Sequence, residues 1–254
     1  MSFTRDFRSS PSAAGVQSAV VDAGLRAYML RVYNWMASGL LLTALVAYGI
    51  ANTSAQALFF RRAEDYSIHP TGLGLLAMIA PLGFVLVMSF GVNRLSRQAV
   101  QTLFWLFCAV MGASLSNIFL VYTGVSVTRV FLVTAITFGA TSLWAYSTNA
   151  NLMRFQSFFM MGLFGLVIAG LVNMFLHSPA VYFVYSVVGV LLFTGLTAFD
   201  TQRIKVTYPQ FAYYEGPEQA AKRSVYDALN LYLNFINLFQ FLLQFMGVRS
   251  TSDN

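Results

Sequence analysis

Charged side chains are scarce in this sequence: Asp, Glu, Lys and Arg together make up 9% of its 254 residues. Water-soluble domains carry about 25% of these residues, because charged side chains cover the surface that faces water. Hydrophobic residues account for 57% of the chain, and this share excludes an intrinsically disordered protein. The composition therefore excludes a soluble globular protein and predicts one that crosses a membrane several times.

Cysteine and histidine are almost absent as well. The one cysteine, Cys108, lies in the apolar run WLFCAVMGASL, so the chain can form neither an internal disulfide nor a cysteine metal site. We expect Cys108 to be a small buried hydrophobic side chain. The two histidines, His69 and His177, lie at the edges of apolar segments with no metal-ligand partner nearby in sequence. We expect no cofactor.

Seven apolar segments are each long enough for a transmembrane helix, which needs about 20 residues. They run over Val32–Ala51, Gly72–Val92, Ala99–Tyr122, Thr128–Ser147, Phe155–Leu176, Ala180–Ile204 and Val225–Val248. The sequence therefore predicts an all-α polytopic membrane protein. Residues 25–248 form its seven-helix transmembrane domain, with an N-terminal tail over 1–24 and a C-terminal tail over 249–254. Two longer connections, Asn52–Thr71 and the stretch after Lys205, contain Pro, Gly and paired charges and are expected to be surface loops.

The basic residues indicate the orientation of these spans. Of the 15 Lys and Arg residues, 11 fall on the side of the N-terminus and 4 on the opposite side. Cytoplasmic connections carry the excess of Lys and Arg, so we expect a cytoplasmic N-terminus and a C-terminus outside the plasma membrane. A re-entrant last segment would return the C-terminus to the inside. Because the basic residues are dispersed rather than gathered in one patch, nucleic acid is not an expected partner.

The last span carries one stripe of polar residues. Its members follow one another at intervals of three or four positions, which places them on one helix face. They are Asp227, Asn230, Asn234, Asn237, Gln240 and Gln244. Two interpretations are open: interhelical hydrogen bonds worth about 0.6 kcal/mol each, or a hydrophilic path along the helix. Both place this helix at the centre of the protein.

Asp200, in GLTAFDTQRIK, is the carboxylate that lies deepest within a span. It is either a helix-end carboxylate satisfied by Arg203 or water, or a group that responds to protons and cations, since burial and neighbouring charges control its ionisation. The sixth and seventh spans are antiparallel, so Asn234 and Asp227 are within its reach. Arg94, at the end of the second span, is either a membrane anchor or an ion-pair partner of Asp200.

Three strings resemble the Bax-inhibitor family, also called the transmembrane Bax inhibitor motif family, in a bacterial form. They are VYNWMASGLLLTALVA, GLTAFDTQRIK and ALNLYLNFINLFQFLLQFMG, and the resemblance extends from Leu25 to Gly247. It implies six helices around a central last helix, a location in the bacterial inner membrane and a pH-sensitive calcium leak. It further implies a pair of aspartates as proton sensor, one on each of the last two spans, and an arginine that holds the closed state.

Matched by position, the first aspartate of the pair is Asp200 and the arginine is Arg94. The second aspartate falls on Asn234, where this sequence departs from the family pattern. An amide cannot ionise, but it can donate a hydrogen bond to an ionised carboxylate. We therefore expect proton sensing to centre on Asp200, which is also a possible transient calcium contact. The polar path would be formed by Asp227, Asn230, Asn237 and Gln240.

The alternative functions are a membrane regulator and an enzyme. The protein could be a non-transporting regulator that binds membrane proteins such as a quality-control protease, with the loop FAYYEGPEQ as docking surface or plain connector. An enzyme is not expected. Asp200 and Asp227 are the one pair of acids that a protease could use, no HExxH zinc motif occurs, and no lysine lies mid-helix to bind retinal.

Overall fold

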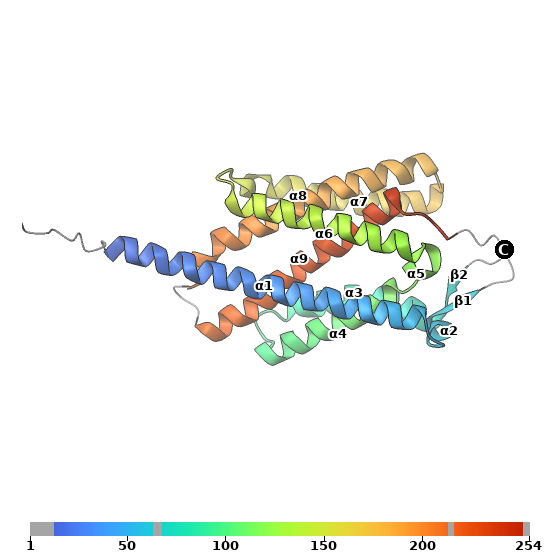
Figure 1. The fold of residues 1–254 in the computed structure, drawn as a ribbon, viewed down its shortest axis with the longest axis horizontal. Coiled ribbons are helices and arrows are strands. Elements are labelled where there is room, and N and C mark those ends of the chain that lie inside the picture. Colours follow the sequence, from blue (N-terminus) through green and yellow to red (C-terminus); the bar gives the residue numbers. More distant parts are fainter. Residues whose placement is uncertain (1–12, 63–67, 213–215, 251–254) are drawn as a thin grey trace, which may run out of the picture.

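The computed structural model describes residues 13–62, 68–212 and 216–250, and these are almost entirely helical. The seven long helices of the described residues run roughly along one axis (Figure 1). They are α1 (Ala13–Ala51), α3 (Gly72–Phe90), α4 (Arg97–Leu115), α6 (Gly124–Ser147), α7 (Gln156–Leu176), α8 (Pro179–Ala212) and α9 (Pro217–Met246). All seven are long and apolar enough to cross a membrane, so the predicted all-α, seven-span architecture is confirmed.

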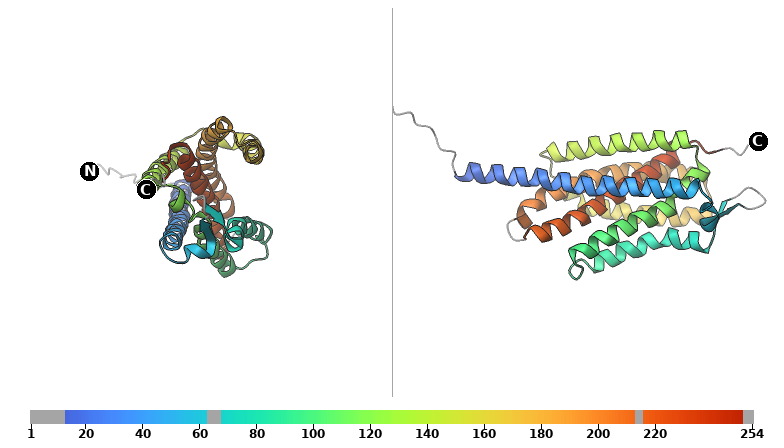
Figure 2. Two further views of the ribbon diagram at one scale, coloured as in Figure 1. Left: turned by 90° about the vertical axis from the view of Figure 1, so that its right-hand side faces the viewer. Right: turned by 60° about the horizontal axis from the view of Figure 1, so that its bottom comes forward.

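Short elements complete the connections. They are α2 (Gln56–Phe59), the antiparallel strands β1 (Phe60–Arg62) and β2 (Ile68–Pro70), α5 (Ile118–Val121) and the 3₁₀ turn η1 (Leu152–Phe155). The hairpin lies at the end of the bundle opposite Ala13, and residues 248–250 lie at this far end too (Figures 1 and 2). The last helix therefore runs the full length of the bundle rather than turning back.

Helix α9 is the centre of the bundle. Of its most apolar stretch 61% is buried, against 6% for α7 and 22% to 33% for the other five helices. It packs on α1, α4, α6 and α8, and the end-on view in Figure 2 shows it between two groups of helices. The predicted central position of the polar-striped last helix is confirmed.

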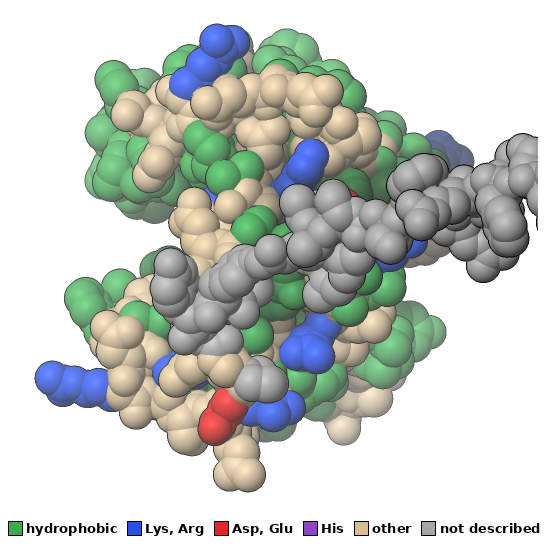
Figure 3. All heavy atoms as spheres, turned by 90° about the vertical axis from the view of Figure 1, so that its left-hand side faces the viewer, with side chains coloured by type: hydrophobic (Ala, Val, Ile, Leu, Met, Phe, Trp, Pro, Cys, Tyr) green, Lys and Arg blue, Asp and Glu red, His purple; other side chains and the backbone are tan. Residues whose placement is uncertain are grey.

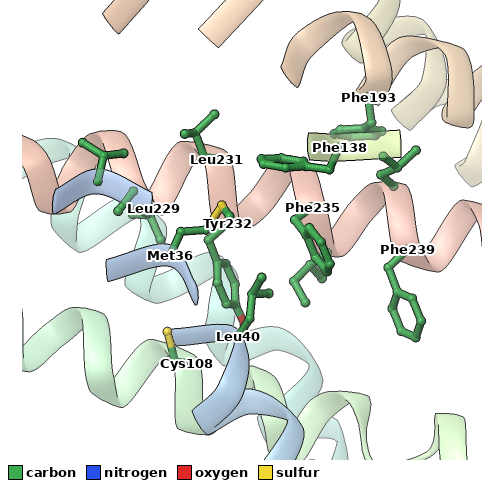
Figure 4. Packing of buried hydrophobic residues seen from close by; sticks show 14 of the residues in the cluster. Met36, Leu40, Cys108, Phe138, Phe193, Leu229, Leu231, Tyr232, Phe235 and Phe239 are labelled. Atoms are coloured by element: carbon green, nitrogen blue, oxygen red, sulfur yellow. The ribbon is translucent and has the colours of Figure 1, made fainter. Parts of the chain in front are cut away.

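The apolar sides of α9 form the core. Leu231, Leu238 and Leu243 are almost completely buried. Tyr232 points from α9 toward Cys108 of α4 and Leu40 of α1 (Figure 4). Its hydroxyl lies 2.7 Å from Thr43 Oγ1 on α1, which in turn donates to the Cys108 carbonyl at 2.9 Å. Cys108 itself is fully buried, as expected from its apolar surroundings.

The stretch after Lys205 was wrongly predicted to be a loop. Helix α8 continues through Ala212, and α9 already begins at Pro217. The extension is stabilised by aromatic packing: the rings of Tyr208 and Phe211 lie 5.2 Å and 5.3 Å from that of Tyr28 on α1. The proline that suggested a loop, Pro209, falls in the last turn of α8. Its missing N–H removes one helix hydrogen bond, the bond to the Lys205 carbonyl, and the aromatic packing outweighs this loss. Of the proposed docking segment FAYYEGPEQ, residues 213–215 lie outside the described residues.

The first helix also starts earlier than the predicted first span. Helix α1 begins at Ala13, well inside the segment predicted as an N-terminal tail, and the membrane-length stretch starts at Val21 rather than Val32. Tyr28 and Met29, which precede the predicted span, are buried against the bundle. The extra turns of α1 bring Tyr28 to the candidate site.

Candidate functional site

Asp200 and Asn234 face one another across the contact between α8 and α9. Asn234 Nδ2 donates a hydrogen bond of 2.7 Å to Asp200 Oδ2, and both residues are buried. Two antiparallel helices that pack along much of their length bring these positions together, as the sequence predicted. The amide group donates to the charged form of the carboxylate and so stabilises it.

The two residues after Asp200 fix the rotation of α8 about its axis. Thr201 Oγ1 lies 3.2 Å from Ser142 Oγ on α6. The Gln202 side chain donates to the Ala150 carbonyl at 2.5 Å and accepts from the Leu152 amide at 2.6 Å. Because α6 and the connection before η1 hold these two side chains, Asp200 is directed toward α9. Both residues are part of the string GLTAFDTQRIK, but no pattern in the sequence indicates their partners on α6 and before η1.

Arg203 bridges two carboxylates. Its guanidinium lies 3.0 Å from Asp200 Oδ1 and 3.6 Å from Asp227 Oδ1. The Arg203 side chain is 34% exposed, whereas those of Asp200 and Asp227 are 10% and 14% exposed. The arginine thus separates two nearly buried acids from the solvent. The ion pair of Asp200 with Arg203 was one of the two interpretations of this carboxylate, and it is present.

Tyr28 ties a third helix to this cluster. Its hydroxyl donates a hydrogen bond of 2.7 Å to Asp227 Oδ2. Asn234, Asp200, Arg203, Asp227 and Tyr28 therefore form one continuous polar chain that joins α1, α8 and α9, which we call the polar chain below. Sequence reasoning missed Tyr28, because this residue precedes the expected first span and its partner lies 199 residues further on.

Arg94 is not part of this cluster. It lies exposed in the turn between α3 and α4, and in the described part of the chain the ion pair of Asp200 is made with Arg203 instead. Arg203 is three residues from Asp200 on the same helix, so it reaches the carboxylate without any movement of α3. The Arg94–Asp200 contact is therefore not formed in this conformation.

The remaining stripe residues divide between the two interpretations. Gln244 accepts a hydrogen bond from Ser186 of α8 at 3.3 Å, as interhelical bonding requires. Asn237 Nδ2 instead donates to the Leu233 carbonyl of its own helix at 2.8 Å. Asn230, Asn237 and Gln240 are half-buried, so part of each of these residues stays accessible outside the packed helices.

A resident metal site is not formed by the side chains that the structure describes, since no three His, Cys, Asp or Glu residues cluster there. Calcium takes six to eight oxygen ligands. Asp200 and Asp227 supply carboxylate oxygens, but Arg203 occupies the space between them. The arrangement can contact a passing cation only when the guanidinium moves away.

Comparison with known proteins agrees with this architecture. The family model described as "Inhibitor of apoptosis-promoting Bax1" matches residues 25–251. The uncharacterized protein RP147 of Rickettsia prowazekii is 44% identical over 229 residues, covering 90% of this chain and 92% of the relative. The inner membrane protein YbhL of Escherichia coli K12 is 43% identical over 229 residues, covering 89% and 94%. This chain therefore belongs to the Bax inhibitor family and is a multi-pass membrane protein.

Proposed function

We propose that this protein is a pH-sensitive cation leak of the bacterial inner membrane, with calcium as the transported ion and Asp200 as the proton-responsive gate. The observation that carries the proposal is the polar chain: a buried carboxylate held by one amide and one guanidinium where α1, α8 and α9 meet. Buried ionisable groups inside a membrane domain are costly, and they commonly mark ion or proton pathways.

The contacts of Asp200 suggest how a proton would act. The ionised carboxylate accepts from Asn234 and pairs with Arg203. A proton removes the negative charge that strengthens both contacts, and the charge pairing of Arg203 is then left to its longer contact with Asp227. The groups that face Asp200 from α8 and α9 are thus Arg203 and Asn234, with Asp227 and Tyr28 behind them. Protonation of Asp200 weakens the α8–α9 contact. In this proposal the conformation with that contact intact is the closed one, so the closed conformation is favoured at higher pH.

The half-buried side chains of Asn230, Asn237 and Gln240 support the second part of the proposal. Asn230 lies between Asp227 and Asn234 of the polar chain, and Asn237 and Gln240 continue on the same helix face toward the far end of the bundle. Amide oxygens are suitable transient ligands for calcium, and amides carry no charge that would trap it. A cation released past Arg203 would therefore meet neutral oxygen ligands along α9.

A flux assay tests this function. The purified protein is reconstituted into liposomes loaded with a calcium indicator, and calcium entry is followed at pH 6 and pH 8. We expect faster entry than into protein-free vesicles, a higher rate at pH 6, and loss of the pH difference in Asp200→Asn. Entry no faster than into empty vesicles at both pH values would reject the proposal.

The second candidate, a non-transporting regulator that binds another membrane protein, is favoured by one feature. Helix α7 packs mainly on α8, and only 6% of its most apolar stretch is buried, which leaves a long face free for a neighbouring helix. Photo-crosslinking from Phe164, an exposed residue of α7, would identify such a neighbour in intact cells. Crosslinks to lipid alone would remove the support for this function.

A further inference from the structure

A second polar feature lies apart from the polar chain, in a cleft between α1, α4 and α9. The cleft has a volume of about 650 Å³ and is lined by Arg31, Trp35, Arg97, Gln101, Glu218 and Ala221. It opens at the end of the bundle where α4 and α9 begin. Figure 3 looks onto this end and shows basic side chains spread over it, with few acidic ones in view.

The cleft carries a positive charge that the described residues do not neutralise. Arg31 and Arg97 are both exposed, and neither forms an ion pair within the described part of the chain. Glu218 is the one acid that lines the cleft, so the balance is one net positive charge. Helices α4 and α9 also begin here, and the positive ends of helix dipoles add to the attraction for an anion.

The residues of the cleft change in character with depth. Trp35 follows Arg31 by one turn of α1, and Gln101 follows Arg97 by one turn of α4, so each lies about 6 Å further into the bundle. Trp35 packs against Phe104 and Trp105 of α4, at ring distances of 5.7 Å and 5.6 Å. Tryptophan concentrates at the boundary between headgroups and hydrocarbon, so we expect the arginines, one turn nearer the end of the bundle, at the level of the lipid phosphates.

Further along both helices the surface is apolar. Leu41 on α1 and Leu106 on α4 are 61% and 50% exposed, as hydrocarbon contact requires. From the end of the bundle inward, the cleft thus presents two guanidinium groups, then an indole and an amide, then aliphatic side chains. This is the order of phosphate, glycerol and acyl chain in a phospholipid.

We propose that this cleft is a binding site for an anionic phospholipid, with Arg31 and Arg97 as the ligands of its phosphate group. Guanidinium groups bind phosphate through paired hydrogen bonds, and basic pockets between transmembrane helices bind anionic headgroups. Two arginines that are far apart in sequence but line one cleft distinguish this site from the general attraction of a basic surface. A lipid held here would join α1, α4 and α9. The proposal of this lipid site does not rest on the proposed cation leak.

Tryptophan fluorescence supplies the test. The chain has three tryptophans, so the double substitution Trp105→Phe with Trp144→Phe leaves Trp35 as the sole reporter. The reporter protein is reconstituted in bilayers that contain a small fraction of dibrominated phosphatidylglycerol or, separately, dibrominated phosphatidylcholine. We expect markedly stronger quenching of Trp35 by the brominated phosphatidylglycerol at equal mole fraction.

Substitutions locate the binding groups. In Arg31→Gln with Arg97→Gln we expect the preference for phosphatidylglycerol to fall about tenfold, whereas Arg31→Lys with Arg97→Lys keeps most of it. Arg26→Gln with Arg154→Gln is the matched control, because it removes two exposed positive charges outside the cleft. Equal quenching by the two lipids in the unsubstituted reporter would overturn the proposal whether or not the variants fold. An equal loss in the control and the cleft variant would overturn it too.

Discussion

Asn234 donates a hydrogen bond of 2.7 Å to the carboxylate of Asp200, at the position where the family resemblance implies a second aspartate. These two positions are therefore in direct contact, with an amide in place of a second carboxylate. This site does contain another carboxylate, that of Asp227, which lies two turns before Asn234 on α9. Arg203 contacts both Asp227 and Asp200 and so joins them. The negative charge of the site is thus distributed along the helix axis rather than paired at one level.

Asn234→Asp should change how calcium flux depends on pH. At pH 8 two ionised carboxylates would face one another within hydrogen-bonding distance, and their repulsion would weaken the α8–α9 contact. At pH 6 a shared proton would join them. We expect the ratio of calcium flux at pH 8 to flux at pH 6 to rise severalfold above that of the unsubstituted protein, measured in the liposome assay. Asn149→Asp is the control, since Asn149 is exposed and lies outside both the polar chain and the proposed cation path, and an unchanged ratio in Asn234→Asp would contradict the prediction.

Arg203→Gln should destabilise the folded protein. The substitution removes the guanidinium that contacts both Asp200 and Asp227 and leaves two nearly buried carboxylates without it. Breaking a buried ion pair by removing one partner costs about 3 kcal/mol, and the partial exposure of Arg203 places the expected loss somewhat below that value. Thermal unfolding in detergent at pH 8 measures it.

Two further variants separate the charge effect from lost packing. Arg203→Gln combined with Asp200→Asn should regain part of the stability, because one of the unpaired charges is gone. Arg154→Gln should leave the unfolding temperature nearly unchanged, since Arg154 contacts the exposed ring of Phe155. A double variant no more stable than Arg203→Gln alone would show that packing, not charge, dominates.

Tyr28→Phe removes one hydroxyl and keeps the ring. The ring still packs on Tyr208 and Phe211, but Asp227 loses the hydrogen bond at its Oδ2. Hydrogen bonds to charged groups contribute about 1.5–3 kcal/mol, so the unfolding temperature should fall by several degrees. Tyr33→Phe, a half-buried tyrosine on the same helix, should have a much smaller effect. Equal losses in both variants would mean that the Tyr28 hydroxyl has no special role.

The sequence predicts part of this site. Whether a residue could be predicted depends on what determines the position of its partner. Asp200 and Asn234 could be paired in advance, because helical spacing and antiparallel neighbours place them at similar depth. Arg203 was expected near Asp200, but its second contact with Asp227 depends on side-chain direction across α8 and α9. Tyr28 and Gln202 could not be found, since their partners lie on elements whose rotation only tertiary packing determines.

The fold, like the site, could be predicted from the sequence only in part. Seven spans are readable from hydropathy, since each must satisfy its backbone hydrogen bonds internally. The extension of α8 beyond Lys205 is not readable, because it depends on Tyr208 and Phe211 packing on α1. Local signals such as Pro209 indicated a loop there, and aromatic burial overrode them.

The orientation of the protein in the membrane remains a prediction, and cysteine labelling can test it. Cys108 is fully buried, so the unsubstituted protein should react with a membrane-impermeant maleimide only after denaturation. It therefore serves as the background for two single substitutions at exposed positions, Ser54→Cys and Asn149→Cys.

Ser54 follows α1 and Asn149 follows α6, so they lie at opposite ends of the bundle. With the N-terminus in the cytoplasm, as the excess of Lys and Arg on that side indicates, Ser54→Cys should be labelled in intact spheroplasts. Asn149→Cys should be labelled only after the membrane is permeabilised. The reverse pattern would place Asp200, Arg203 and the arginine-lined cleft on the outer face, where the gate would sense external rather than cytoplasmic pH.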